Sequence, residues 1–415
     1  MNNTTSPTVT STAERPRAVL ATVAVNHVTH DGFSESLPVL LPVWQVAFAL
    51  SLTEAGLLNT AFVLAMALFQ IPAGFLAERF GERIVMTAGT LVIGGAFVWL
   101  GNANGYLAIA LALAVAGFGS ATQHPLASAL VARAFPMAGR RAALGIYNFS
   151  GDIGKVAFPV SLALLLTVGD WTRAVTVFGF VAIGVAIAMA ILLAWTKAGG
   201  SHRNAEGKHA PPSGKGWGVT DRLGFSTLST VFVIDTTVRS AFITLLPFLI
   251  VSKGIAVEEV GLFLSMLFIG GAVGKFACGI LAERLGVVRT VLVTEVSTAV
   301  LIVATVFAPI SASYVLFPLL GIALNGTSSA LYGSVAEFTD PNRHARAFGL
   351  FYTLGIGIAA ATPAIAGLAG DVMGLSTAIA ISGALALVTL PLALMLRAPL
   401  AKASSLAMSV AAKTE

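Results

Sequence analysis

The amino-acid sequence predicts an all-α membrane protein with twelve transmembrane helices, arranged as two homologous six-helix bundles. Three observations support this prediction: the composition, the spacing of the apolar stretches, and a repeat shared by the two halves. Of the 415 residues, 56% are hydrophobic and 10% are charged, and the mean hydropathy is +0.88. A soluble protein carries about 25% charged residues. Most of this chain must therefore face lipid.

Twelve apolar stretches each approach the ~20 residues that a helix needs to cross the hydrocarbon core. Their expected bounds are 19–48, 55–76, 84–101, 105–133, 143–167, 172–195, 223–250, 257–280, 289–309, 312–336, 345–369 and 375–396. A polar segment rich in Gly, Ser, Pro, Lys and His separates the sixth stretch from the seventh and is typical of a flexible linker. We expect a disordered cytoplasmic tail, an N-terminal bundle, a cytoplasmic linker, a C-terminal bundle and a second disordered cytoplasmic tail, over 1–18, 19–196, 197–222, 223–397 and 398–415.

The basic residues predict the orientation in the membrane. With both termini placed in the cytoplasm, nineteen of the 24 Lys and Arg residues fall in cytoplasmic segments, and only Arg173 and Lys253 fall on the opposite side. The other three, Lys155, Arg239 and Lys275, lie within the spans. This bias follows the positive-inside rule. We expect a multi-pass protein of the cell inner (plasma) membrane with both termini cytoplasmic.

The two halves share a repeat at an offset of 204–205 residues. The segment Gly74–Gly81, GFLAERFG, returns as Gly279–Gly286, GILAERLG. At the same offset, two acidic residues of the first span align with Asp235 and Arg239 of the seventh. Two homologous halves around a central site near the bilayer midplane are the plan of a secondary transporter.

A polar stretch, Asn26–Glu35, interrupts the first apolar run. His27, Asp31 and Glu35 are spaced four residues apart, so they stack along one helix face. Ionisable residues inside a membrane are costly, and they normally mark a functional site facing a polar interior. Asp31 and Glu35, with His27, are therefore the expected proton-coupling residues. Alternatively, they only pair with buried cations and hold helices together, and the two roles can coexist.

Other polar residues within the spans are predicted to line the central cavity. Asp152 and Lys155, three residues apart, can pair locally, as can Asp235 and Arg239. Lys275 has no neighbouring acid in its own helix, so it needs a carboxylate across the cavity or an anionic substrate. The full expected cavity set is His30, Gln70, His124, Tyr147, Asn148, Asp152, Lys155, Asp235, Arg239 and Lys275.

Two polar residues have other interpretations. His124 precedes Pro125 and can stabilise a helix kink instead of binding a ligand. Glu295 is expected near a membrane interface, where it would be solvated or take part in gating.

Catalysis is not expected. The sequence shows no nucleophile–base pair with an orienting residue, no cluster of His and carboxylate at metal-ligand spacing, and no phosphate-binding loop between a strand and a helix. A single cysteine, Cys278, excludes a disulfide framework. We expect no enzyme activity, no cofactor, no metal and no nucleic-acid partner. Without a nucleotide-binding motif, an ion gradient must supply the energy.

The repeated Gly-x-Leu-Ala-Glu-Arg-x-Gly segments resemble the signature loop of the major facilitator superfamily, with Glu in place of the usual Asp. Further motifs narrow the resemblance to its fosmidomycin-resistance branch. His27–Asp31 is similar to that branch's His-x-x-Asn-Asp, with His30 replacing Asn, and Gln123–Ser128 contains its His-Pro-x-x-Ser. Gly151–Lys155 carries Asp152 where the branch has an amide. The resemblance implies the major facilitator fold and a monomer. The expected gating residues are Gly74, Glu78, Arg79, Gly81, Arg133, Gly279, Glu283, Arg284 and Gly286.

This resemblance implies a proton-coupled secondary transporter that exports a small organic compound in exchange for protons, by rocking one half against the other. The three cations within the spans favour a substrate with a carboxylate or phosphonate group. A proton-coupled uptake symporter for an organic anion is one alternative. A non-transporting membrane sensor with the same fold is another. The expected partners are a small-molecule substrate, protons and the lipid bilayer.

Overall fold

The computed structural model describes residues 15–135, 137–200, 216–340, 344–403 and 405. Most of the predicted linker and of both predicted tails lies outside these ranges. The first helix begins at Pro16, inside the stretch expected to be a disordered tail, and helical turns continue over 397–403.

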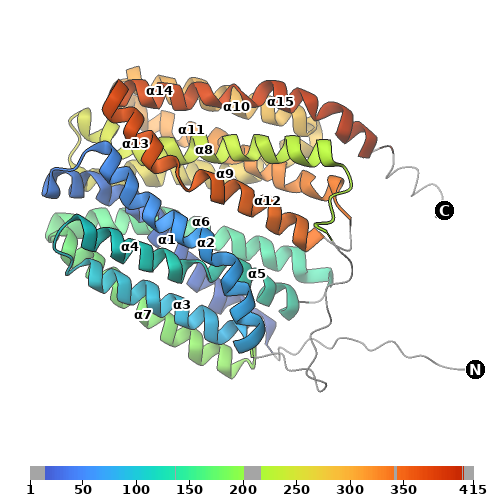
Figure 1. The fold of residues 1–415 in the computed structure, drawn as a ribbon, viewed down its shortest axis with the longest axis horizontal. Coiled ribbons are helices and arrows are strands. Elements are labelled where there is room, and N and C mark those ends of the chain that lie inside the picture. The colour runs from blue at the N-terminus through green and yellow to red at the C-terminus, as the bar shows by residue number, and fades with distance from the viewer. Residues whose placement is uncertain (1–14, 136, 201–215, 341–343, 404, 406–415) are drawn as a thin grey trace, which may run out of the picture.

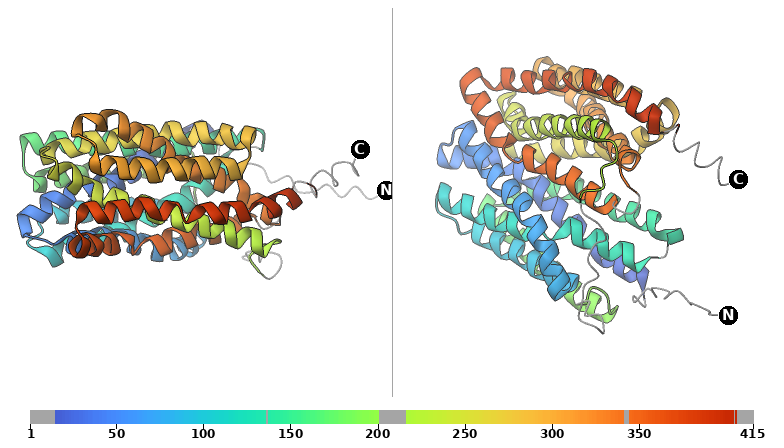
Figure 2. Two further views of the ribbon diagram at one scale, coloured as in Figure 1. Left: turned by 90° about the horizontal axis from the view of Figure 1, so that it is seen from above. Right: turned by 45° about the vertical axis from the view of Figure 1, so that its right-hand side comes forward.

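The described ranges form fifteen α-helices and three short 3-10 helices. Figure 1 shows α1–α7 gathered in one half of the molecule and α8–α15 in the other. The helices run broadly along one common direction, as the turned views in Figure 2 also show. Their bounds are α1 (Pro16–Phe48), α2 (Leu52–Phe80), α3 (Glu82–Leu100), α4 (Tyr106–Ser120), α5 (Gln123–Ala134), α6 (Met137–Val168), α7 (Trp171–Trp195), α8 (Arg222–Ser252), η1 (Val257–Glu259), α9 (Val260–Leu285), α10 (Val287–Phe307), η2 (Ile310–Ala312), α11 (Ser313–Ser334), η3 (Val335–Phe338), α12 (His344–Ala359), α13 (Thr362–Met373), α14 (Leu375–Ala386) and α15 (Thr389–Met395).

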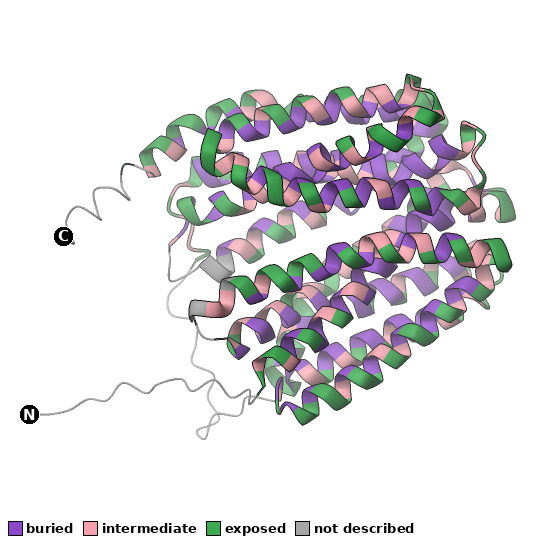
Figure 3. Cartoon of the chain, turned by 180° about the vertical axis from the view of Figure 1, so that it is seen from behind, coloured by how far each residue is buried: buried purple, intermediate pink, exposed green. Residues whose placement is uncertain are grey.

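Eleven segments of the described chain are long and apolar enough to cross a membrane. The remaining long helix, α1, has 33 residues and carries the polar stretch Asn26–Glu35. Large apolar side chains such as Val168, Phe276 and Phe307 are mostly exposed, and Figure 3 shows exposed residues running along the outer faces of the helices. Such surfaces are suited to lipid. The predicted all-α fold with twelve transmembrane helices is confirmed.

Three predicted spans are broken near a proline. The span 105–133 consists of α4 and α5, the span 345–369 of α12 and α13, and the span 375–396 of α14 and α15. Pro125, Pro363 and Pro391 lack the N–H that would bond to the carbonyl four residues earlier, and each break falls at that point. The first break matters for function because it brings His124, in the first turn of α5, to the central cavity.

The two signature segments are helical, although we predicted loops. Gly74–Phe80 forms the end of α2 and Gly279–Leu285 the end of α9. Only Gly81 and Gly286 leave the helix, with φ angles of 86° and 84°, in the left-handed region that favours glycine. The predicted second and eighth spans are therefore about one turn too short.

Glycine permits close packing of α9 against α11. Gly270 lies against the carbonyl group of Pro318, and Gly321 lies against the carbonyl group of Leu267, so that an added Cβ at either glycine would overlap a backbone oxygen. Small residues are typical of such contacts because van der Waals packing drives helix association in membranes.

Replacing Gly321 with leucine should therefore destabilise the protein by about 1–3 kcal/mol through overpacking. The measurement is the thermal unfolding midpoint in detergent. Gly184→Leu on α7 is the matched control, because no atom lies within 4 Å of an added Cβ there. Equal midpoints for the two variants would contradict this account of the α9–α11 contact.

Candidate functional site

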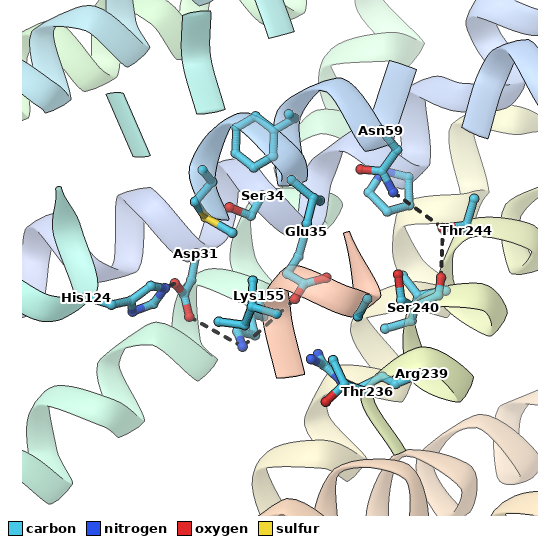
Figure 4. Close-up of a pocket in the computed structure, with 17 residues that line it drawn as sticks. Asp31, Ser34, Glu35, Asn59, His124, Lys155, Thr236, Arg239, Ser240 and Thr244 are labelled. Atoms are coloured by element: carbon cyan, nitrogen blue, oxygen red, sulfur yellow. Dashed lines mark hydrogen bonds and ion pairs between the residues drawn. The ribbon is translucent and has the colours of Figure 1, made fainter. Parts of the chain in front are cut away.

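A cavity of about 210 Å³ lies between the two halves and is lined by residues of α1, α2, α5, α6, α8 and α12 (Figure 4). Asp31, Glu35, Lys155 and Arg239 contribute charged groups to its wall, and Phe62 is among its apolar residues. Ligand pockets usually enclose about 300–1,000 Å³, so this cavity is smaller than most and would hold only a small molecule.

Asp31 on α1 is the centre of the polar cluster at one end of this cavity. The residue is only 7% exposed. Its Oδ1 lies 3.3 Å from His27 Nε2, 3.2 Å from His30 Nδ1 and 3.6 Å from His124 Nε2. Its Oδ2 lies 3.4 Å from Lys155 Nζ on α6. One carboxylate thus contacts three imidazoles and one ammonium group.

Two of these imidazole rings also form hydrogen bonds to backbone carbonyl oxygens through the ring nitrogen that does not face Asp31. His27 Nδ1 lies 2.8 Å from the Tyr147 carbonyl oxygen, and His30 Nε2 lies 2.9 Å from the Ser120 carbonyl oxygen. The Tyr147 ring also stacks on the His27 ring, with centroids 4.2 Å apart. Both histidines are 3% exposed. Their remaining ring nitrogens point toward Asp31.

Glycines on α6 make room for this cluster. A Cβ at Gly151 would lie 2.6 Å from Asp31 Oδ2 and 2.7 Å from the His27 ring, and a Cβ at Gly154 would overlap the Val28 carbonyl group. The two glycines therefore let α6 approach α1 closely enough for Lys155 to reach Asp31.

Glu35 shares Lys155 with Asp31. Its Oε1 lies 3.9 Å from Lys155 Nζ, and both carboxylates line the cavity (Figure 4). The predicted stripe of Asp31 and Glu35 along one face of α1 therefore does meet a cation. This contact also agrees with the alternative in which the stripe pairs with a buried cation.

The predicted local pairing of Asp152 with Lys155 is replaced by a contact across the two halves. Asp152 Oδ1 on α6 accepts a hydrogen bond from Lys275 Nζ on α9 at 2.5 Å. Lys275 thus has a carboxylate partner, which its neighbours in α9 do not supply. The sequence could not predict this partner because the choice depends on how the halves meet.

Among the described residues, Arg239 is the charged residue of the cavity wall that forms no ion pair with a carboxylate, and Figure 4 shows its guanidinium facing the cavity. Asp235, one turn earlier on α8, does not line the cavity and is 4% exposed. Asp235 interacts electrostatically with Arg239 and also lies within hydrogen-bonding reach of Glu295 on α10. Glu295 is 1% exposed, so it is not solvated, which was one of the two roles expected for it.

Three further cavity predictions have a different outcome. Tyr147 is fully buried behind His27, whereas Gln70 is half-buried and Asn148 is exposed. None of the three lines the cavity. Sequence reasoning also missed Asn59, Ser240 and Thr244, which do line it. Asn59 could have been found, since it is an amide within an apolar stretch of α2.

Sequence reasoning also missed a set of buried side-chain hydrogen bonds next to the cluster. Asn26 donates a hydrogen bond to Gln123 and accepts one from Thr90 Oγ1 at 3.1 Å. These contacts join α1 to α5 and α3, so they help to hold the imidazoles in place.

The expectation of no metal-ligand spacing is wrong in the folded chain. Ligand atoms of His27, Asp31 and His124 all lie within 4.8 Å of one another. Lys155, however, places a fixed positive charge 3.4 Å from the same carboxylate, and a divalent cation would be repelled by it. We therefore do not assign a metal site to the cluster.

The predicted gating residues lie at the ends of α2, α5 and α9. Glu78, Arg79, Glu283 and Arg284 are exposed. Arg133 instead forms an ion pair with Glu82, a buried acid at the start of α3. Sequence reasoning missed Glu82, although it follows directly after the first signature segment.

Two sets of long helices enclosing a polar cavity define a multi-pass membrane protein of the transporter class. The family model described as the Major Facilitator Superfamily matches residues 24–234 and 228–410. The chain belongs to this family, and the resemblance seen in its motifs is confirmed.

Individual relatives are distant. The chain is 23% identical over 368 residues to the fosmidomycin resistance protein of Escherichia coli, a match that covers 87% of this chain and 88% of that protein. It is 24% identical over 265 residues to the probable sulfoacetate transporter of Cupriavidus necator, covering 60% of this chain and 61%, less than two thirds, of that protein. A solved bacterial homologue of the human lysosomal transporter Spinster, inward-facing and unoccupied, matches with a TM-score of 0.76 at 17% identity, over 94% of this chain and 98% of that one. This last likeness shows the fold.

Proposed function

We propose that this protein is a proton-coupled secondary active transporter of a small organic anion, working as a monomer in the cell inner membrane by alternating access. The observation that carries the proposal is the position of Asp31, a buried carboxylate at the cavity between three imidazoles and the Lys155 ammonium. Proton binding in this cluster changes the charge of the cavity wall. A gradient of protons can thereby alter the binding of a charged substrate.

The cations of the cavity support an anionic substrate. Lys275 is paired with Asp152, and Lys155 is shared by Asp31 and Glu35, which leaves Arg239 available. A guanidinium group offers several donors in a fork that matches carboxylate, sulfonate or phosphonate oxygens. The sulfoacetate named for one relative is an anion of this class.

The same charges favour a coupling mode in which the proton and the anion bind together. An added proton in the cluster partly neutralises the charge of Asp31, so the positive charge of Lys155 is less fully compensated. Lys155 can then add to Arg239 as a partner for the anion while it stays beside Asp31. This charge arrangement favours symport, whereas the resemblance to the fosmidomycin-resistance branch favours export in exchange for protons.

Transport in proteoliposomes tests the proposal and separates the two modes. Sulfoacetate and fosmidomycin are the first probes, with a pH gradient imposed in either direction. Under symport, the anion accumulates when the outside is acidic; accumulation with an acidic inside would instead support antiport. Anion flux that ignores the pH gradient would contradict proton coupling. Binding of these probes without any flux would favour the non-transporting sensor.

Alternating access requires a contact between the halves that opens and closes. Asp371 on α13 accepts hydrogen bonds from the backbone N–H groups of Leu52 and Thr53, at 2.9 and 2.8 Å, and so caps α2 in the other half. Gly367 lies against the Leu52 carbonyl group beside this cap. With both termini in the cytoplasm, the start of α2 faces the outside. We infer that the cap is a latch that holds the outer side closed.

Removing the latch with Asp371→Ala should populate outward-open states. An N-cap contributes about 0.5–2 kcal/mol, so we expect roughly fivefold faster labelling of a cavity cysteine from outside. The reporter is Asn59→Cys in a Cys278→Ser background, treated with an impermeant thiol reagent. Glu54→Ala is the control, because Glu54 caps the same helix from within its own half. Equal labelling rates in the two variants would count against the latch.

A further inference from the structure

We propose that the transported proton is held on an imidazole, His27 or His30, against an ionised Asp31, and that His124 passes it between this site and the cavity. The inference deepens the proposed function and rests on it: it assigns the proton to particular atoms. Sequence spacing alone had suggested the carboxylates Asp31 and Glu35 as the main carriers.

The backbone contacts determine which nitrogen of each ring is free. A carbonyl oxygen only accepts, so His27 Nδ1 and His30 Nε2, at 2.8 and 2.9 Å from their carbonyls, both carry hydrogen. In the neutral rings, His27 Nε2 and His30 Nδ1 are therefore lone-pair acceptors. Both face the same Asp31 oxygen, at 3.3 and 3.2 Å, and no donor reaches the buried His27 Nε2. A lone pair facing a carboxylate is repulsive.

One added proton removes this repulsion at the ring that binds it. The protonated ring donates one N–H to its backbone carbonyl and the other to Asp31, which is a charge-assisted hydrogen bond. Every polar hydrogen of the imidazolium then has an acceptor. The two rings share a single carboxylate oxygen, so the site is suited to one proton at a time.

The surroundings favour a proton on the ring over a proton on the carboxyl group. Asp31 also faces Lys155 at 3.4 Å, and a neutral Asp31 would leave that ammonium with Glu35 at 3.9 Å as its nearest acid. An ionised Asp31 keeps both of its cationic partners. The titratable and charged groups facing the site are Glu35 on α1, His124 on α5, Tyr147, Asp152 and Lys155 on α6, Arg239 on α8 and Lys275 on α9.

His124 is suited to relay the proton because it alone of the three rings is open to the cavity. Its side chain is 41% exposed, against 4% for His27 and 3% for His30. Its ring meets both buried rings edge-on, with centroids 5.2 Å from His27 and 4.9 Å from His30. A proton arriving from the cavity therefore reaches His124 before the buried pair.

Nitrogen NMR of the full-length protein, labelled at its six histidines, tests the assignment without any substrate. Single replacements His27→Asn, His30→Asn and His124→Asn identify the three signals. We expect His27 in the Nδ1–H form and His30 in the Nε2–H form at high pH, and conversion of one of them to imidazolium on acidification. In Asp31→Asn this conversion should be lost.

Infrared spectroscopy tests the alternative, in which the proton is bound by the Asp31 carboxyl group. If both rings stay neutral while a protonated-carboxyl band appears on acidification and is missing in Asp31→Asn, the proton sits on Asp31 and the assignment is overturned.

Transport tests the relay separately: His124→Gln should slow proton-driven uptake about tenfold and leave the tautomers of His27 and His30 unchanged. Unchanged uptake would overturn the relay. Imidazolium formation in a protein whose flux ignores pH gradients would retain the proton site and refute the proposed function.

Discussion

Replacing Asp31 with asparagine should abolish proton-driven uptake while leaving the fold intact. The change removes the carboxylate that holds Lys155 and the imidazole cluster. Removing one partner of a buried ion pair costs about 3–5 kcal/mol when the other charge is left uncompensated, but here Lys155 keeps Glu35 as a second acid. Protonation of the cluster should weaken correspondingly, and accumulation driven by a pH gradient should fall by about a hundredfold or more.

The measurement is initial uptake into proteoliposomes at a fixed pH gradient. Glu259→Gln is the matched control, because it neutralises a carboxylate that is exposed at the start of α9. A thermal unfolding scan of both variants separates lost coupling from lost folding. Wild-type accumulation in a folded Asp31→Asn protein would mean that the proton is carried elsewhere.

Replacing Arg239 with glutamine should have the second large effect, on substrate affinity. Hydrogen bonds to charged groups contribute about 1.5–3 kcal/mol, so the KM for the transported anion should rise about 10- to 150-fold. Arg239→Lys keeps the charge but loses the forked donor set, and its KM should lie between those of the wild type and Arg239→Gln.

The KM is measured from concentration-dependent uptake at constant pH gradient. Arg173→Gln neutralises an exposed arginine at the start of α7 and should leave the KM unchanged. If Arg239→Gln also leaves it unchanged, the anion binds away from α8, and the unpaired guanidinium is not its partner.

The sequence was sufficient to predict the fold because the signals repeat. Apolar stretches of membrane-spanning length and the signature segment in both halves each point to the same architecture, and the family match agrees. Helix ends were less predictable. The polar Ala-Glu-Arg segments look like loops, yet the helices α2 and α9 continue through them until Gly81 and Gly286.

Contacts within the site were predictable only where the two residues share one helix. The spacing of His27, Asp31 and Glu35 determines that they lie on one face, and that face does reach the cavity or its supporting cluster. The interaction partners that lie on other helices could not be predicted from the sequence. Asp152 contacts Lys275 and not its neighbour Lys155, because the packing of α6 against α9 decides the pairing.

Burial was the other source of error. Glu295 lies near the start of its span in sequence, which suggested a solvated carboxyl group, but α10 packs so that this group is buried beside Asp235. The His124 contact with Asp31 likewise depends on the break between α4 and α5, which hydropathy does not reveal.

Proton movement driven by the substrate tests the central claim most directly. Proteoliposomes containing a trapped pH indicator are given an inward gradient of an anion that the protein transports, with no initial pH difference. We predict acidification of the interior that depends on the anion and is absent in Asp31→Asn. Anion entry without any change of internal pH would contradict the proton-coupled account.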